Sequence, residues 1–175
     1  MRPPESFEYP KTTYFAEYLN FEPENHLVGI LKSQQTELLK IYQNLQKGQE
    51  NFAYAPGKWS LQQVLGHMID TERIFSYRAL AISRGEKQVL PGFDENEYVI
   101  GAQYESQTLT EILNQYRHVR LATLSLIESF STNQANQMGH VNGNSVSVRA
   151  LSWMIAGHEK HHIQVIKERY ISQNP

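Results

Sequence analysis

A helical repeat of apolar residues dominates the sequence and limits the folds that it can adopt. In four long segments, apolar residues recur at spacings of three and four, and no proline interrupts any of them. These segments cover about residues 24–46, 60–84, 108–130 and 147–171. Because each such helix has an apolar face that must be buried, the pattern predicts an all-α fold, a four-helix bundle in a single domain spanning residues 1–175.

Local signals support two helix starts and argue against a sheet. Ser60 is followed three residues later by a glutamine, and Thr108 by a glutamate, which is the pattern of a capping box. Strands have little support, because short apolar runs such as Val89–Leu90 and Val141 lie in loops without partners of comparable length.

The connection between the second and third helices is unusually long. Neighbouring antiparallel helices in simple bundles are joined by about two to eight residues, whereas residues 86–107 separate these two. At about 3.3 Å per residue, this connector can run the full length of a helix of about 37 Å. The sequence therefore allows these helices to run parallel, joined by a long crossover connection.

Composition narrows the classes of partner. Lys and Arg total 16 against 18 Asp and Glu, so the chain lacks the basic surplus of a nucleic-acid-binding protein. Its apolar stretches are shorter than the roughly 18 residues needed to span a membrane, and its first residues lack the apolar run of a signal peptide. We expect a cytoplasmic protein that binds neither nucleic acid nor membrane.

The chain has no cysteine and seven histidines. The absence of Cys excludes disulfides, thiolate metal ligands and a sulfur nucleophile supplied by the protein. Imidazole is then the soft ligand that remains for a transition metal. Whether it is used depends on where the histidines lie on the helices.

His158 and His162 lie one turn apart in the middle of the apolar face of the last helix. Buried imidazoles need partners, which can be polar side chains of the core or a shared metal ion. The i, i+4 spacing on a buried face favours the metal.

The same segment matches the HExxH pattern of zinc proteases, in which Glu159 would act as a general base. The extended form of that pattern requires glycine where Val165 stands, and the sequence offers no strand to hold a peptide. We therefore interpret the match as a coincidence of helical spacing.

A third ligand should come from another helix. His118 is flanked by Arg117 and Arg120, which indicates a solvated surface, whereas His67 lies at the margin of the apolar face of the second helix. Helical geometry therefore favours His67. The four candidates outside the last helix are His26, His67, His118 and His140.

Three neutral imidazoles leave a fourth coordination position open, as in catalytic rather than structural sites. Such rings need neighbours that fix their tautomers. For Glu72 an ion pair with Arg73, Arg78 or a cation of the last helix is the competing interpretation. The candidates for this supporting role are His161, Glu159, Asp70 and Glu72.

Three stretches resemble the DinB-like superfamily of metal-binding bundles, including YfiT-like metal-dependent hydrolases. They are GKWSLQQVLGHMIDTERIFSYRALAISRG, LPGFDENEY and SVSVRALSWMIAGHEKHHIQVIKERY. The resemblance implies a bundle with two parallel helices, often a homodimer, that holds zinc or nickel with three histidines. Matched to the motifs, these are His67 in LGHMID, His158 in AGHEK and His162 at the end of HEKHH.

The resemblance also implies an activity on a small molecule. Relatives include hydrolases and enzymes that transfer or isomerise groups with a low-molecular-weight thiol such as bacillithiol or mycothiol. An open metal site lowers the pKa of a bound thiol or water, and because this chain lacks Cys, any thiol must come from a cosubstrate. Tyr98, Asp94 and Glu159 are the candidate acids. The expected pocket residues are Trp59, Phe93, Asp94 and Tyr98.

Two other interpretations remain open. The bundle could bind a metal or small ligand without turnover, or it could be a helical dimerisation module whose histidines only pack.

Overall fold

Four long helices form the bundle, and each lies within a range predicted from the sequence. The computed structural model describes residues 1–172, apart from the side chains of residues 13, 14 and 16. Two of the helices begin with the expected capping boxes. An all-α four-helix bundle with a long crossover is therefore confirmed. The helices are α2 (Leu27–Gln43), α3 (Leu61–Ser83), α5 (Leu109–Glu128) and α7 (Val148–Val165), and the last continues into a π-helical turn, η3 (Ile166–Ile171).

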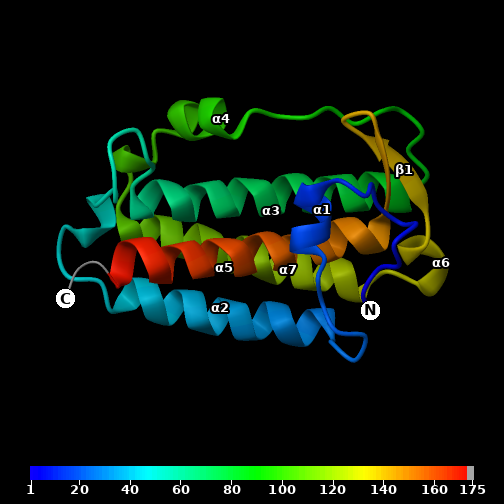
Figure 1. Ribbon diagram of the computed structural model, residues 1–175, viewed down its shortest axis with the longest axis horizontal. Coiled ribbons are helices and arrows are strands. Elements are labelled where there is room, and N and C mark those ends of the chain that lie inside the picture. The colour runs from blue at the N-terminus through cyan, green and yellow to red at the C-terminus, as the bar shows by residue number, and fades with distance from the viewer. Residues whose placement is uncertain (173–175) are drawn as a thin grey trace.

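The bundle has the parallel pair that the long connector allows. In Figure 1, α3 and α5 run in one direction while α2 and α7 run in the other. Helix α3 packs against both α5 and α7, and α2 packs against the same two helices. The polypeptide between α3 and α5 returns along the outside of α3, across the top of Figure 1. None of the described helices is both long and apolar enough to cross a membrane.

Short elements complete the fold. The long connector, expected to be a loop, contains a helix that begins where Asp94 Oδ1 accepts hydrogen bonds from the backbone N–H groups of Asn96 and Glu97, at 2.9 and 3.0 Å. The short elements are α1 (Thr13–Tyr18), η1 (Gln49–Asn51), α4 (Glu95–Ala102), η2 (Tyr104–Ser106), α6 (Thr132–Ala135), β1 (Met138–Val141) and β2 (Asn144–Ser147).

The expectation that Val89–Leu90 and Val141 lack strand partners was wrong. Strands β1 and β2 form an antiparallel hairpin, and Leu90 adds a parallel bridge to Val141. The hairpin turns at Asn142 and Gly143, whose φ angles are +48° and +76°. An Asn-Gly pair is favoured in two-residue hairpins because both positions need positive φ.

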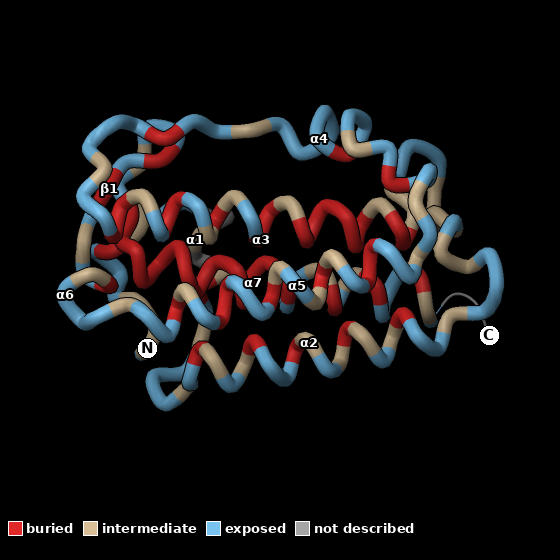
Figure 2. Tube along the Cα trace, turned by 180° about the vertical axis from the view of Figure 1, so that it is seen from behind, coloured by how far each residue is buried: buried red, intermediate tan, exposed pale blue. Residues whose placement is uncertain are grey.

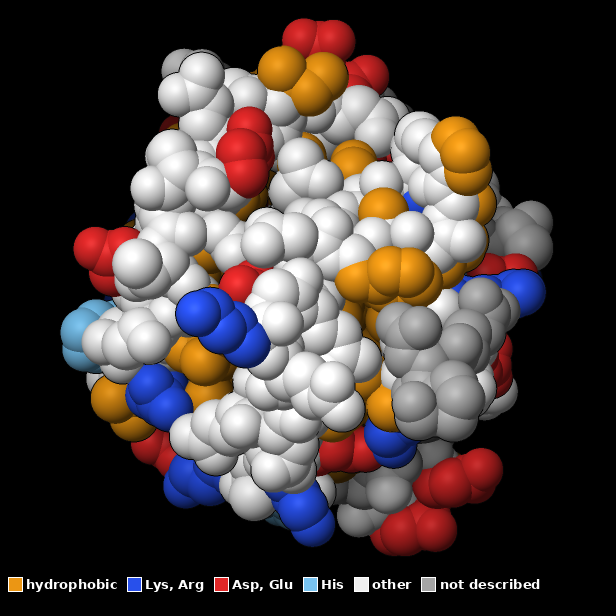
Figure 3. All heavy atoms as spheres, turned by 90° about the vertical axis from the view of Figure 1, so that its left-hand side faces the viewer, with side chains coloured by type: hydrophobic (Ala, Val, Ile, Leu, Met, Phe, Trp, Pro, Cys, Tyr) orange, Lys and Arg blue, Asp and Glu red, His pale blue; other side chains and the backbone are white. Residues whose placement is uncertain are grey.

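Helix α7 is the most enclosed element of the bundle. Figure 2 shows it buried along most of its length between the other helices. It links two apolar clusters, since Ala156 belongs to the cluster near the hairpin and Ile163 to the cluster near the opposite end. On that opposite end, which Figure 3 presents, acidic and basic side chains alternate with small apolar patches.

A buried ion-pair cluster ties the four long helices together. Arg120 of α5 is fully buried, which corrects its assignment to a solvated surface. Its guanidinium donates to Glu72 of α3 at 2.7 and 3.0 Å, to Glu159 of α7 at 2.6 Å and to the carbonyl of Leu31 in α2 at 2.8 Å. Tyr116 adds a 2.5 Å hydrogen bond to Glu159. Each of the four helices thus supplies at least one polar group to this cluster, and α5 supplies two.

Candidate metal centre

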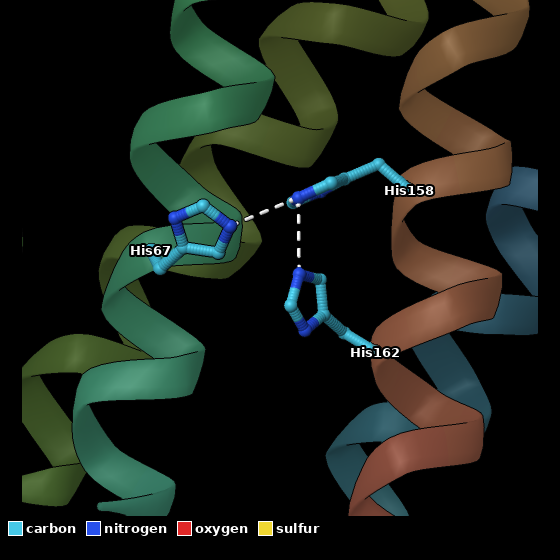
Figure 4. A group of neighbouring side chains, drawn as sticks. All are labelled: His67, His158 and His162. Carbon is cyan, nitrogen blue, oxygen red and sulfur yellow. Dashed lines mark hydrogen bonds between the residues drawn. The ribbon is translucent and has the colours of Figure 1, made fainter. Parts of the chain in front are cut away.

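Three imidazoles from two helices converge at the centre of the bundle. His67 extends from α3, and His158 and His162 extend from successive turns of α7 (Figure 4). The Nε2 atom of His158 lies 2.9 Å from that of His67 and 3.1 Å from that of His162. One possible ligand atom from each ring lies within 4.8 Å of the other two. The structure therefore brings together the three residues that the sequence analysis selected.

Two glycines allow the polypeptide to pack closely beside these histidines. Gly66 precedes His67, and a Cβ atom there would collide with the ring of Tyr104. Gly157 precedes His158, and a Cβ atom there would collide with the backbone of Tyr18, at the end of α1. The sequence therefore provides small residues where the flanking segments press on α3 and α7.

The surroundings keep all three rings neutral near pH 7. Burial lowers the pKa of His67 to about 4, against an opposing effect of Asp70. Burial and then repulsion from the neighbouring histidines lower the pKa of His158 well below its usual value and that of His162 to about 3. A neutral imidazole has a free nitrogen lone pair, which is the form that binds a metal.

Hydrogen bonds alone do not account for this arrangement. A ring nitrogen of a neutral imidazole either carries one hydrogen or offers one lone pair, so it serves one neighbour well. The Nε2 atom of His158 faces two neighbours instead. Three nitrogens held tetrahedrally at about 2.1 Å from one ion would stand about 3.4 Å apart, a few tenths of an ångström more than observed. The donor set therefore fits a small divalent cation.

The histidines form part of the wall of a cavity of about 390 Å³. Helices α3 and α7 form its floor, and α1, the long connector and the β1–β2 hairpin enclose its sides. Apolar atoms contribute most of the surface of its wall. The residues that line it are Phe15, Tyr18, Trp59, His67, Thr71, Phe75, Arg78, Gly92, Phe93, Glu95, Val141, Asn142, Asn144, Val146, Leu151, Met154, His158, His161 and His162.

Two of the four expected pocket residues line this cavity. The ring of Trp59 lies 4.7 Å from that of His67, and Phe93 lies on the connector side. Asp94 and Tyr98 lie outside the described wall. Asp94 caps α4, and the ring of Tyr98 lies tilted against that of Phe93, with 48% of the surface of Tyr98 exposed.

The expected supporting residues have different surroundings. His161 lines the cavity, with its ring 5.4 Å from that of Tyr18. Asp70 accepts hydrogen bonds from Tyr104 at 2.6 Å and from Arg73 at 3.0 Å.

Glu72 and Glu159 belong to the ion-pair cluster of Arg120. The ion pair expected for Glu72 therefore exists, but its cation belongs to α5. The expected partners were Arg73, Arg78 or a cation of α7. Burial raises the pKa of Glu159, although Arg120 opposes this effect. Because Glu159 bonds to Arg120 and Tyr116, it is not available as the base of an HExxH protease.

The other three histidines are exposed and lie outside the cluster. His26 stands at the start of α2, His118 on the outer side of α5 and His140 on β1.

Sequence reasoning missed three cavity residues of α3. Thr71, Phe75 and Arg78 follow His67 by four, eight and eleven positions and share its side of the helix. Their spacing could have revealed them, because residues on the same face of a helix as one site residue can line the same pocket.

Comparisons with known proteins agree with the fold. A family model described as the DinB superfamily matches residues 30–166. Among solved structures, YfiT from Bacillus subtilis is similar over 97% of this chain and 98% of that chain, with a TM-score of 0.76 and 14% identity. It is described as a probable metal-dependent hydrolase with an unusual four-helix bundle topology. No curated protein sequence matches the chain.

Proposed function

We propose that this chain, which belongs to the DinB superfamily, is a divalent-metal-dependent enzyme that acts on a small molecule. The reaction is hydrolysis or transfer to a low-molecular-weight thiol. One observation carries the proposal: three neutral imidazoles converge on the wall of a cavity that is large enough for a small substrate. The description of YfiT as a metal-dependent hydrolase supports the same class.

The proposed ligands are His67, His158 and His162, and the proposed metal is zinc or nickel. Held by three nitrogens, such an ion retains an open position and lowers the pKa of a water or thiol towards neutrality.

The chain itself supplies neutral ligands and a largely apolar pocket. Burial keeps the imidazoles unprotonated, and the adjacent rings of Trp59 and Tyr18 restrict their movement. The aromatic walls surround the reacting groups with apolar surface, which strengthens electrostatic interactions there. Because the sequence has no cysteine, a sulfur nucleophile would be that of a thiol cosubstrate.

The second candidate function is metal or small-ligand binding without turnover. The observation that favours it concerns Glu159, the carboxylate next to a proposed ligand. This side chain is held by Arg120 and Tyr116 and therefore supplies no base to the cavity.

Metal analysis followed by activity assays tests the proposal. We expect purified protein to bind one zinc or nickel ion per chain, and His67→Ala or His162→Ala to lose that ion. His118→Ala and His140→Ala remove exposed imidazoles outside the cluster and should retain it. Metal content that is unchanged in His158→Ala would refute the site.

Activity separates the two candidate functions. The metal-loaded protein is assayed with aryl esters, and with several thiols plus a chloro-nitroaromatic acceptor. Turnover that is lost in His67→Ala and kept in His118→Ala supports an enzyme. Stoichiometric metal binding without turnover on either panel supports the binding function instead.

A further inference from the structure

The cavity contains a buried cation beyond the histidine cluster. Arg78 lies on the same side of α3 as His67, eleven residues further along, and only 6% of its surface is exposed. It contributes to the cavity wall, and its Nη2 atom donates a 2.7 Å hydrogen bond to the carbonyl of Pro91. Of the described residues that line the cavity, it is the one Arg or Lys.

Aromatic rings hold the guanidinium in a defined position. Its Cζ atom lies 5.7 Å from the ring centre of Phe75 and 5.6 Å from that of Phe93, which are cation–π distances. Phe75 belongs to α3 and Phe93 to the connector, so the cation is clamped between two elements. A side chain fixed in this way loses little entropy when it binds a ligand.

A buried guanidinium in an apolar wall is suited to one chemical class of ligand. Its planar fork matches a carboxylate with two parallel hydrogen bonds, and low polarity around it strengthens that attraction. Glu95, the one carboxylate of the described cavity wall, is exposed. Its repulsion of an anion is therefore screened by water.

We propose that the cavity takes a substrate with a carboxylate group, which Arg78 binds while the reactive group lies at the histidine cluster. This inference rests on the proposed function and specifies its substrate class. The ring of Phe75 lies between the two subsites, 6.3 Å from the ring centre of His158 and 5.7 Å from Cζ of Arg78. The substrate therefore spans at most about 12 Å between them, with its apolar part against Phe75.

A series of bifunctional ligands tests the proposal by binding rather than by turnover. The probes are monohydroxamates of linear dicarboxylic acids with different chain lengths, and the neutral methyl ester of each. Isothermal titration calorimetry measures their Kd with the zinc-loaded protein. At the best chain length, we expect the acid to bind about 10- to 100-fold more tightly than its ester, the range of a charge-assisted hydrogen bond.

Substitutions assign that preference to one side chain. Arg78→Met keeps the apolar length of the side chain and should abolish the acid-to-ester ratio, whereas Arg78→Lys should retain part of it. Arg84→Met removes the same charge from the exposed C-cap position that follows α3 and should leave the ratio unchanged. A ratio that persists in Arg78→Met, or is absent from the parent protein at every chain length, would overturn the proposal.

Acetohydroxamate separates failure of this inference from failure of the proposed function. It contains the metal-binding group alone, so its Kd should be the same in the parent protein and in Arg78→Met. If it does not bind, the metal site fails, and glutarate titrated into metal-free protein tests the carboxylate subsite by itself. In that NMR titration, a shift of the Arg78 Nε–Hε signal supports the subsite, and an unmoved signal overturns it.

Discussion

Removing Arg120 should weaken the bundle more than any other single charge deletion that we consider. Arg120→Met keeps most of the apolar side chain and eliminates hydrogen bonds to Glu72, Glu159 and the Leu31 carbonyl. The two carboxylates then remain in the core, where their side chains are only 5% and 4% exposed. Water cannot replace the lost partner at such positions.

The expected cost is about 3–5 kcal/mol, the range found when one partner of a buried ion pair is deleted. A domain of this kind is stable by about 5–15 kcal/mol, so the change removes a large part of the total. Most of the cost is the desolvation of a stranded carboxylate rather than the loss of attraction. Replacing the whole cluster with apolar side chains should therefore cost much less than this single change.

The pH dependence identifies this cause. Burial already raises the pKa of Glu159, and Arg120 opposes that effect. Without Arg120, the native state binds a proton at this carboxyl that the unfolded chain has released. The free energy of unfolding of the variant should then rise relative to the parent as the pH falls, by up to about 1.4 kcal/mol per pH unit.

Urea unfolding followed by circular dichroism at pH 8.5 and pH 6.0 measures both effects. Arg117→Met changes a half-buried residue of the same helix and removes a solvent-exposed hydrogen bond to Asn114, so it should alter stability by less than about 0.5 kcal/mol. The reasoning is refuted if Arg120→Met costs no more than this control, or if its cost increases as the pH falls.

Three further predictions concern the site. Metal-free protein should lose stability as the pH falls below 6.5, because burial lowers the pKa of His67 to about 4 and the unfolded chain takes up the proton first. His67→Gln should reduce the slope of the free energy of unfolding against pH by about 1.4 kcal/mol per pH unit. Equal slopes for the variant and the parent in urea unfolding would contradict this. Gly157→Ala should cost about 1–3 kcal/mol in the same assay because its Cβ would meet the Tyr18 backbone. Gly29→Ala, in open space on α2, should stabilise the protein by up to about 1 kcal/mol, and similar effects of the two changes would argue against close packing of α1 on α7. Zinc at about 100 times its Kd should raise the free energy of unfolding by about 2.7 kcal/mol, and a shift that persists in His158→Ala would place the ion elsewhere.

The bundle and the histidine cluster could be predicted because both follow from helical geometry. A residue spacing of four fixes two side chains on one face, so His158 and His162 had to project together once α7 was recognised. His67 followed from the same reasoning on α3. The face on which each of these histidines lies is set by the periodicity of its own helix.

The environment of Arg120 could not be predicted in this way, because burial of a charge depends on partners from other helices. Its neighbours in sequence, Arg117 and His118, indicated a surface. Its neighbours on the helix gave the opposite signal, since Arg120 lies between Tyr116 and Leu124 on the apolar stripe of α5. The outcome depended on Glu72 and Glu159, whose convergence on α5 is a property of the assembled bundle.

The β1–β2 hairpin was missed for a different reason. Each strand has four residues, too few for a periodic pattern. The local evidence was the turn itself, because Asn142–Gly143 is a sequence that favours the observed geometry. Turn chemistry was therefore more informative here than apolar periodicity, and it placed Val141 and Val146 against the cavity.

The HExxH segment of α7 places adjacent residues in two different clusters, with His158 in the histidine cluster and Glu159 in the ion-pair cluster of Arg120. Consecutive residues point about 100° apart, so His158 faces α3 and the cavity while Glu159 faces Arg120 of α5. In a zinc protease the glutamate must reach the same space as the histidines, whereas here burial of α7 on several sides directs it into the ion-pair cluster. That cluster connects the two helices that carry the histidines, because Arg120 joins Glu72, five residues after His67, to Glu159, next to His158. Glu159 therefore serves this site by fixing the relative position of α3 and α7, and the chemistry of the cavity must be carried by other groups.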